Sequence, residues 1–171
     1  MLSLVQLTDA DIVLRPFQAE DSTQLHHAVR ESLQELKPWM SWATENYTEF
    51  TARDYIAITQ NNELLGSCTL SSIHPIYHFC NVGYWVRTSK HGQGIAGRAA
   101  KLAARFAFEH VGLVRAEIVI ARDNMASRRV AEKIGAHYEG ILLNRMIIGP
   151  AVSDAHMYSL LPSDFGLAAR L

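Results

Sequence analysis

The spacing of apolar residues predicts that the chain begins with a strand followed by a helix. Residues 11–17 (DIVLRPF) alternate apolar and polar side chains around Ile12 and Leu14 and then meet Pro16, which is typical of a half-buried strand that a proline ends. Residues 18–36 carry leucine and valine at spacings of three or four. That period places the apolar side chains on one face of a helix.

A β-hairpin is predicted next, because two β-rich runs in residues 54–73 flank Asn61 and Asn62. Asparagine tolerates the positive φ that a tight hairpin turn requires. Between the helix and the hairpin, residues 37–42 (KPWMSW) form an apolar loop and residues 47–53 form at most a short helical turn. The remaining predicted elements are a strand at 79–86, a helix at 96–112, a strand at 114–121, a helix at 123–135 and two strands around Gly149 and Pro150 within 136–161.

This order of elements indicates one mixed α/β domain over residues 1–171. The strand at 114–121 ends in an unbroken apolar run, as a central strand does. The helix at 96–112 has a polar stripe opposite a face of mostly small residues, so it can lie close to a sheet. That face consists of Ala99, Leu102, Ala103 and Phe106.

Composition excludes several classes of protein. The 171 residues include 16 basic and 17 acidic side chains, so nothing indicates a nucleic-acid-binding surface. The N-terminus lacks the basic start of a signal peptide, and no apolar stretch reaches the roughly 20 residues that span a bilayer. Cys68, Cys80 and the eight scattered histidines lack metal-site spacing, so we expect no metal. We expect a cytoplasmic protein without membrane contact.

Residues 91–101 (HGQGIAGRAAK) contain a literal G-x-G-x-x-G and a near match to the Walker A loop. The dinucleotide fingerprint requires a strand that runs almost directly into the first glycine, whereas RTSKH separates the strand at 79–86 from Gly92. Walker A requires a lysine followed by a serine or threonine, whereas this chain has Arg98 and Ala99. Neither nucleotide-binding interpretation fits.

The same stretch resembles motif A of the GNAT superfamily of N-acetyltransferases, [Q/R]-x-x-G-x-[G/A], with His91 in place of the first Gln or Arg. In that motif, backbone N–H groups at a helix N-terminus cradle the pyrophosphate of coenzyme A. The resemblance therefore implies an acetyl-CoA site on residues His91, Gly92, Gln93, Gly94, Ile95, Ala96, Gly97 and Arg98.

The resemblance covers roughly residues 80–161. This stretch is similar to the branch of ribosomal-protein-serine and -alanine N-terminal acetyltransferases. The resemblance is carried by the motifs Gly83-Tyr84-Trp85, Asn124-Met125-Ala126-Ser127 and Lys133-Ile134-Gly135, the last followed by Tyr138-Glu139-Gly140. It implies an α/β (α+β) GNAT fold, in which helices flank a mixed, mostly antiparallel sheet of about six to seven strands. It also implies that two central strands splay apart and that the pantetheine arm bonds to backbone near Tyr84, Trp85 and Val86.

Ser127 and Asn124 are the candidate functional residues of the helix at 123–135. Helical spacing places Ser127 in the first turn, on the same inward face as Val130, Ala131 and Ile134. The resemblance implies that the Ser127 hydroxyl acts as a general acid toward the leaving thiolate of coenzyme A and that Asn124 anchors the cofactor or the loop. The alternatives are a capping or back-bonding serine and an N-cap asparagine.

The general base is the open position, because Asn81 stands where many members of the family have a glutamate. His74 is taken as a base or water-relay residue, since histidine titrates in the useful range. His78, Tyr138 and Glu139 are further options. A protein α-amine has a pKa near 7.7, so it needs less help from a base than an aliphatic amine, and the missing glutamate favours such an acceptor.

Three functions are compatible with the sequence. The first is acetyl transfer from acetyl-CoA directly to a protein N-terminal α-amine. The second is the same chemistry on a small amine, such as a polyamine, an amino sugar or an antibiotic, and the third is a catalytically weak acyl-CoA-binding module with a regulatory role. A homodimer fits all three. Trp39, Met40 and Trp42 either line the acceptor pocket or belong to the core.

Overall fold

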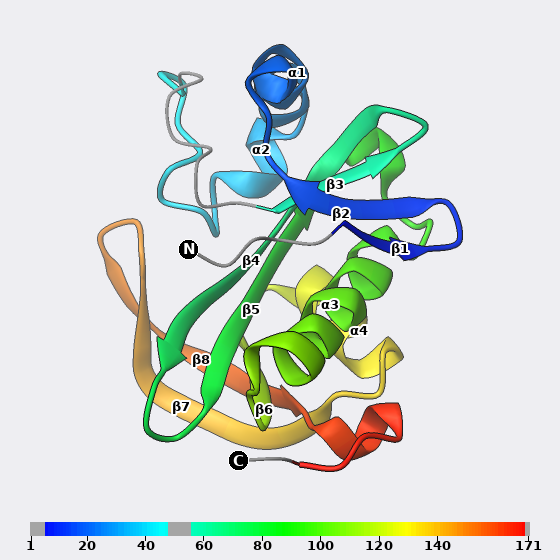
Figure 1. Ribbon diagram of the computed structural model, residues 1–171. Helices are drawn as coiled ribbons and strands as arrows, with labels where there is room; N and C mark the ends of the chain where they lie inside the picture. The colour runs from blue at the N-terminus through cyan, green and yellow to red at the C-terminus, as the bar shows by residue number, and fades with distance from the viewer. Residues whose placement is uncertain (1–5, 48–55, 170–171) are drawn as a thin grey trace. The chain divides into compact units, whose positions relative to one another are not determined.

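The computed structural model describes residues 6–47 and 56–169 (Figure 1). The strands are β1 (Leu7–Asp9), β2 (Ile12–Pro16), β3 (Ile56–Gln60), β4 (Glu63–His74), β5 (Phe79–Val86), β6 (Arg115–Ala121), β7 (His137–Ile148) and β8 (Ala151–Leu160). The helices are η1 (Ala19–Asp21), α1 (Ser22–Glu31), α2 (Leu33–Leu36), η3 (Thr88–Lys90), α3 (Ile95–Phe106), η4 (Ala107–Val111), α4 (Met125–Lys133) and η5 (Pro162–Phe165). The helical turn predicted at 47–53 falls almost entirely outside the described residues.

The strands form one sheet in the order β1-β2-β3-β4-β5-β6-β8-β7. The pair of β5 with β6 is parallel, and the pairs β1–β2, β2–β3, β3–β4, β6–β8 and β7–β8 are antiparallel. This is the mixed, mostly antiparallel sheet that the sequence predicted. The described residues contain eight strands, so the expected six to seven was too few. The additional strand, β1, has three residues and is too short to show a period.

Two compact units share the chain, and neither is continuous in sequence. The first unit comprises Met1–Thr69 and Tyr84–Leu102, and the second comprises Leu70–Gly83 and Ala103–Leu171. Strands β4 and β5 and helix α3 therefore contribute residues to both units. The single-domain assignment of residues 1–171 stays a prediction.

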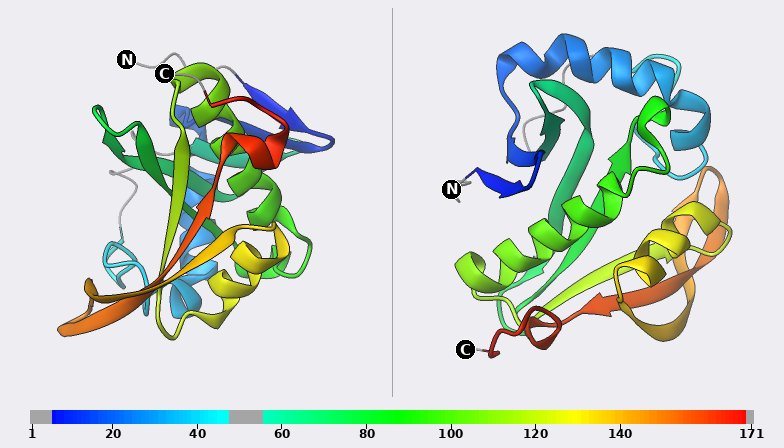
Figure 2. Two further views of the ribbon diagram at one scale, coloured as in Figure 1. Left: turned by 90° about the horizontal axis from the view of Figure 1, so that it is seen from below. Right: turned by 90° about the vertical axis from the view of Figure 1, so that its right-hand side faces the viewer.

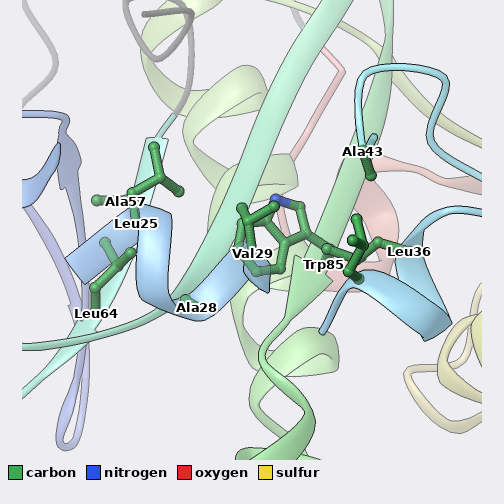
Figure 3. Close-up of a cluster of buried hydrophobic side chains, with 9 residues drawn as sticks. Leu25, Ala28, Val29, Leu36, Ala43, Ala57, Leu64 and Trp85 are labelled. Carbon is green, nitrogen blue, oxygen red and sulfur yellow. The ribbon is translucent and has the colours of Figure 1, made fainter. Parts of the chain in front are cut away.

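The first unit is built on the hairpin of β3 and β4, with Asn61 and Asn62 at φ 48° and 65° as the turn requires. Its core, the α1–α2 core, includes the Trp85 ring, which lies beside Val29 of α1 (Figure 3). The other buried members are Leu25, Ala28, Leu33, Leu36, Ala43, Ala57 and Leu64. Met40 and Trp42 pack against this core, so their side chains serve packing in the first unit.

The helix predicted at 18–36 is interrupted in the structure. η1 and α1 are followed by a break at Ser32, whose φ and ψ are −100° and 7°, and then by the single turn of α2. Ser32 is fully buried, and its hydroxyl accepts a hydrogen bond from the backbone N–H of Thr88 at 3.0 Å. Because the partner is distant in sequence, local periodicity does not reveal this break.

The second unit is built on β6, β8, β7 and α4, and it also includes η4, η5, the end of β4, the start of β5 and the end of α3. Helix α4 lies along β8 (Figure 2), where the Tyr158 hydroxyl donates to Glu132 at 3.1 Å. The elements predicted at 79–86, 114–121 and 123–135 are confirmed as β5, β6 and α4. In the described part of the chain, no helix is long and apolar enough to cross a membrane.

Candidate active site

The end of β5 offers backbone rather than side chains to a ligand. The Trp85 side chain is buried in the α1–α2 core and lies 6.0 Å from the Trp42 ring, centroid to centroid. Val86 is buried as well, and Tyr84 is half-buried. Since the Trp85 ring is already committed to packing, a pantetheine arm on this strand would meet main-chain N–H and C=O groups.

A glycine in the neighbouring strand allows the close approach of backbone at this point. A Cβ atom at Gly66 of β4 would lie 2.1 Å from the Trp85 carbonyl oxygen and 2.8 Å from the Val86 Cα. The sequence arguments did not single out Gly66. An isolated glycine within a strand pattern is the signal that could have found it, since such glycines mark close backbone approach.

The glycine-rich loop has the geometry of an anion cradle. Gly92 and Gly94 have φ of +78° and +75°, a region that residues with a Cβ enter only at a cost. Residues 91–94 are exposed, and α3 begins at Ile95. The first N–H groups of a helix lack intrahelical partners, so they are available to an anion, which the helix dipole also favours.

The side chains on either side of this cradle already have partners within the first unit. The His91 ring Nε2 lies 2.8 Å from the Val86 carbonyl oxygen, so it donates to that oxygen. The Arg98 guanidinium donates to the Asp9 carboxylate at 2.7 Å and to the Asp11 carboxylate at 2.8 Å. These hydrogen bonds, first that to Asp9, raise the pKa of Arg98. A contact between the Arg98 side chain and a phosphate stays a prediction. It requires the guanidinium to exchange the Asp9 and Asp11 carboxylates for the phosphate.

The parallel pairing of β5 with β6 covers only Phe79↔Arg115, Cys80↔Ala116 and Asn81↔Glu117. Both strands continue past this short ladder, and the expected splay of the pair stays a prediction. Where the ladder ends, the Asn81 side-chain oxygen accepts a hydrogen bond from the backbone N–H of Val119 at 3.3 Å. Asn81 therefore caps the ladder and offers no group that could accept a proton.

The N-terminus of α4 is capped by Asn124, whose side-chain oxygen accepts the backbone N–H of Ser127 at 3.1 Å. The N-cap interpretation of Asn124 is thus confirmed, and its role toward a cofactor stays a prediction. Ser127 is half-buried in the first turn, and Ala131 on the same face is fully buried. The predicted inward orientation of that face agrees with this burial.

His74 organises the turn between β4 and β5. Its Nδ1 accepts the backbone N–H groups of Ile76 at 3.3 Å and Tyr77 at 3.1 Å. The ring also stacks on Tyr77 and Phe79, at centroid distances of 4.6 and 5.1 Å. With Nδ1 in use, the neutral ring carries its proton on Nε2. This geometry favours a structural role over the base role that the sequence suggested.

The other candidate bases are also engaged. The Arg115 guanidinium holds the Glu139 carboxylate at 2.7 and 2.6 Å and is the main cause that lowers the pKa of Glu139 to about 2. The Tyr138 hydroxyl lies 3.2 Å from His156 Nδ1, and His78 Nδ1 lies 3.3 Å from the Gly112 carbonyl oxygen. Among the described residues, no cluster of three or more His, Cys, Asp or Glu side chains could hold a metal ion.

The predicted site residues therefore fall into two groups, one in each unit. Residues 84–86 and 91–98 lie together in the first unit, around the end of β5 and the start of α3. Asn124 and Ser127 lie together in the second unit, at the start of α4. His74 lies at the end of β4, directly before the β4–β5 turn, in the second unit.

Comparison with known proteins finds relatives that are named as acetyltransferases. A Bacillus subtilis protein, YdaF, which carries the provisional name ribosomal N-acetyltransferase, is 25% identical over 170 residues, covering 90% of this chain and 93% of its own length. The ribosomal-protein-serine acetyltransferase of Escherichia coli is 29% identical over 102 residues, covering 60% of this chain and 57% of its own. Spermidine N(1)-acetyltransferase of Escherichia coli is 21% identical over 154 residues, covering 84% and 82%.

Among solved structures, RimJ of Mycobacterium smegmatis in complex with a CoA disulfide superimposes with a TM-score of 0.81 at 23% identity, covering 92% of this chain and 85% of that one. The family model described as acetyltransferase (GNAT) domain matches residues 2–137, which is well over half of the chain. The chain therefore belongs to the GNAT acetyltransferase family and is an acetyl-CoA-dependent N-acyltransferase.

Proposed function

We propose that the acceptor of the acetyl group is the α-amine of a protein N-terminus, of the ribosomal-protein type. The observation that carries this proposal is the amide of Asn81 at this position of β5, whose oxygen is held by the Val119 N–H and which cannot accept a proton as a carboxylate would. A protein α-amine is partly neutral near pH 7.7 and can react without a strong base. The names of YdaF and the Escherichia coli ribosomal-protein-serine enzyme support the same acceptor class.

In the proposed mechanism, the neutral amine attacks the thioester carbonyl carbon, a C–N bond forms and the C–S bond breaks. Backbone N–H groups at the end of β5 polarise the carbonyl oxygen. The Ser127 hydroxyl gives its proton to the departing thiolate, so coenzyme A leaves as the thiol and Ser127 regains a proton from solvent. The amine nitrogen loses its surplus proton to water.

The cofactor contacts of this proposal lie on main-chain groups. The loop from His91 to Gly97 would hold the pyrophosphate through N–H groups at the start of α3, and Tyr84, Trp85 and Val86 would hold the pantetheine arm. This division is supported by the side-chain partners of His91 and Arg98 and by the burial of Trp85.

The experiment is a measurement of free thiol release from acetyl-CoA with a panel of amines. Peptides that begin with Ser, Ala or Met are compared with spermidine, an amino sugar and an aminoglycoside. We expect kcat/KM for at least one peptide to exceed that of every small amine. A higher kcat/KM for spermidine would replace the proposed acceptor, and tight acetyl-CoA binding without turnover would indicate a regulatory acyl-CoA-binding module.

The second candidate, acetylation of a polyamine, is favoured by the similarity to spermidine N(1)-acetyltransferase over most of the chain. A polyamine site needs free carboxylates. Of the acidic residues near the predicted acceptor region, Glu45 lies near Lys37 and Arg30, at 3.5 and 3.9 Å. Glu49 and Asp54 lie outside the described residues. Because Glu45 is already paired with Lys37 and Arg30, acetylation of a polyamine is the weaker candidate.

A further inference from the structure

The segment that joins β5 to the glycine-rich loop, Arg87–Lys90, is fastened to the junction of α1 and α2. We call this segment the connector. The Thr88 backbone N–H donates to the Ser32 hydroxyl at 3.0 Å, and the Ser89 backbone N–H donates to the Glu31 carboxylate at 2.7 Å. All of these residues belong to the first unit.

Side chains of the connector reinforce this attachment. The Arg87 Nε donates to Glu31 at 3.0 Å, and the Thr88 hydroxyl donates to the Glu35 carboxylate at 2.8 Å. The connector is also tied to β4, because the Lys90 ammonium lies 2.7 Å from Glu63. The connector thus has partners on α1–α2 and on β4, which are far from it in sequence.

Glu31 is the central acceptor of the connector's attachment. Its two carboxylate oxygens receive one backbone N–H and the Arg87 guanidinium, and these bonds, first those from Arg87, lower the pKa of Glu31 to about 2. Its side chain is 29% exposed, whereas both partners of the Lys37–Glu45 pair are more than half exposed. Charge-assisted bonds with limited exposure are stronger than fully solvated ion pairs.

The glycine-rich loop gains from such an attachment, because its own residues are exposed. Residues 91–94 are exposed, and two of the four are glycines with positive φ. Flexible backbone of this kind loses conformational freedom when it binds a ligand, which weakens affinity. A loop whose N-terminal side is already held pays less of this entropy cost.

We propose that Glu31 and Ser32 are positioning residues that preorder the glycine-rich loop for the cofactor through the connector. This inference rests on the proposed role of residues 91–98 in holding the cofactor phosphates. The two residues bond to the connector, so their effect on the loop is indirect. They hold the connector backbone at Thr88 and Ser89, and thereby set where His91 and Gly92 begin.

Two substitutions separate the parts of this network. Glu31→Gln keeps the size of the side chain and an oxygen for the Ser89 N–H but removes the charge that Arg87 needs. Glu31→Ala removes both bonds. Glu109→Gln serves as the control, because Glu109 is an exposed glutamate whose ion pair is with Arg105, four residues earlier, and not with the connector.

We expect Glu31→Ala to weaken acetyl-CoA binding about ten-fold, the size of the loss of a hydrogen bond to a charged group, and Glu31→Gln to weaken it less. The KM for acetyl-CoA should rise while kcat at saturation stays close to the wild-type value. Without ligand, amide hydrogen exchange of residues 88–97 should become faster in Glu31→Ala and stay unchanged in residues 115–121 of β6. Glu109→Gln should match the wild type in all readouts.

Unchanged exchange in residues 88–97 together with unchanged acetyl-CoA affinity in Glu31→Ala would overturn the inference. Faster exchange over the whole chain would also overturn it, because it would indicate general destabilisation, and Glu31→Gln checks this with a milder change. If the wild-type protein binds acetyl-CoA but substitutions in residues 91–98 leave that affinity unchanged, the proposed cofactor loop fails instead. These outcomes distinguish the two proposals.

Discussion

At the scale of single residues, Ser127 carries the most chemistry in the proposed mechanism. Its backbone N–H is used by the Asn124 cap, and its side chain lies on the half-buried face of α4. The cap fixes the first turn of the helix and therefore the direction of the Ser127 Cα–Cβ bond. Capping and catalysis are compatible here, because they use different atoms of the same residue.

Ser127→Ala should lower kcat by about 10²-fold or more, the usual contribution of a positioned general acid, with acetyl-CoA affinity unchanged. Steady-state kinetics and a titration with acetyl-CoA measure the two quantities. Ser153→Ala, in the β7–β8 hairpin, is the control and should leave both unchanged. Normal turnover of Ser127→Ala at normal acetyl-CoA affinity would exclude the general-acid role.

Gly66→Ala should destabilise the protein and disturb acetyl-CoA binding together. The added Cβ would lie 2.1 Å from the Trp85 carbonyl oxygen, so β4 and β5 must move apart at the strand proposed to bind pantetheine. Overpacking of this kind costs about 1–3 kcal/mol, which urea denaturation measures.

Gly92→Ala is the matched comparison for Gly66→Ala. A Cβ at Gly92 meets no atom within 4 Å, so the cost there comes only from the φ of +78° and amounts to about 1–2 kcal/mol. If Gly66→Ala proved as stable as the wild type, the close approach of β4 and β5 would be wrong.

At the scale of elements, ion pairs link segments that the sequence pattern treats separately. Arg115 of β6 holds Glu139 of β7, and Ser159 of β8 donates to the same carboxylate at 2.6 Å. Glu31 links α1 to the connector in the same way. Both carboxyls have a pKa of about 2, against an ordinary value of 4.5.

The stability of the protein should therefore fall as the pH falls from about 4.5 toward 2. The folded-state pKa values of Glu31 and Glu139 are depressed, so the unfolded state binds more protons in this window and stability is lost there. Urea midpoints between pH 7 and pH 2.5 test this expectation. Glu139→Gln should show a smaller loss over that range than the wild type, and an equal loss would contradict the assignment to Glu139.

Sequence patterns located most elements because their periods are local. The strand at 79–86 and the helix at 123–135 carry clear periods and stop signals, and the structure has β5 and α4 there. β1 and the break at Ser32 were not predicted. β1 is held by pairing with β2, and Ser32 is tied to Thr88, so both depend on partners outside a short window.

At the scale of the whole molecule, ligand binding should stabilise the folded chain. A ligand that binds only the folded state at 100 times its Kd adds about 2.7 kcal/mol, which corresponds to a rise in Tm of about 5–10 °C for a chain of this size. Thermal unfolding with acetyl-CoA and with coenzyme A should show this rise, and AMP at the same concentration should give a smaller one.

Gly94→Ala should reduce the rise in Tm that acetyl-CoA causes, because it strains the loop proposed to hold the pyrophosphate. An equal rise in Gly94→Ala and wild type would place the cofactor phosphates elsewhere.

The sequence by itself determined the family and the order of most strands and helices, since motif spacing and periodicity are recorded along the chain. It also offered Asn124 as a helix cap and placed Asn61 and Asn62 at a turn of positive φ. The tertiary structure alone decided which side chains remain available for chemistry. Arg98, His91, His74 and Glu139 each have hydrogen-bond partners elsewhere in the fold. Such partners lie across turns, strands and helices, and hydrogen bonds between them form only when folding brings those elements into contact.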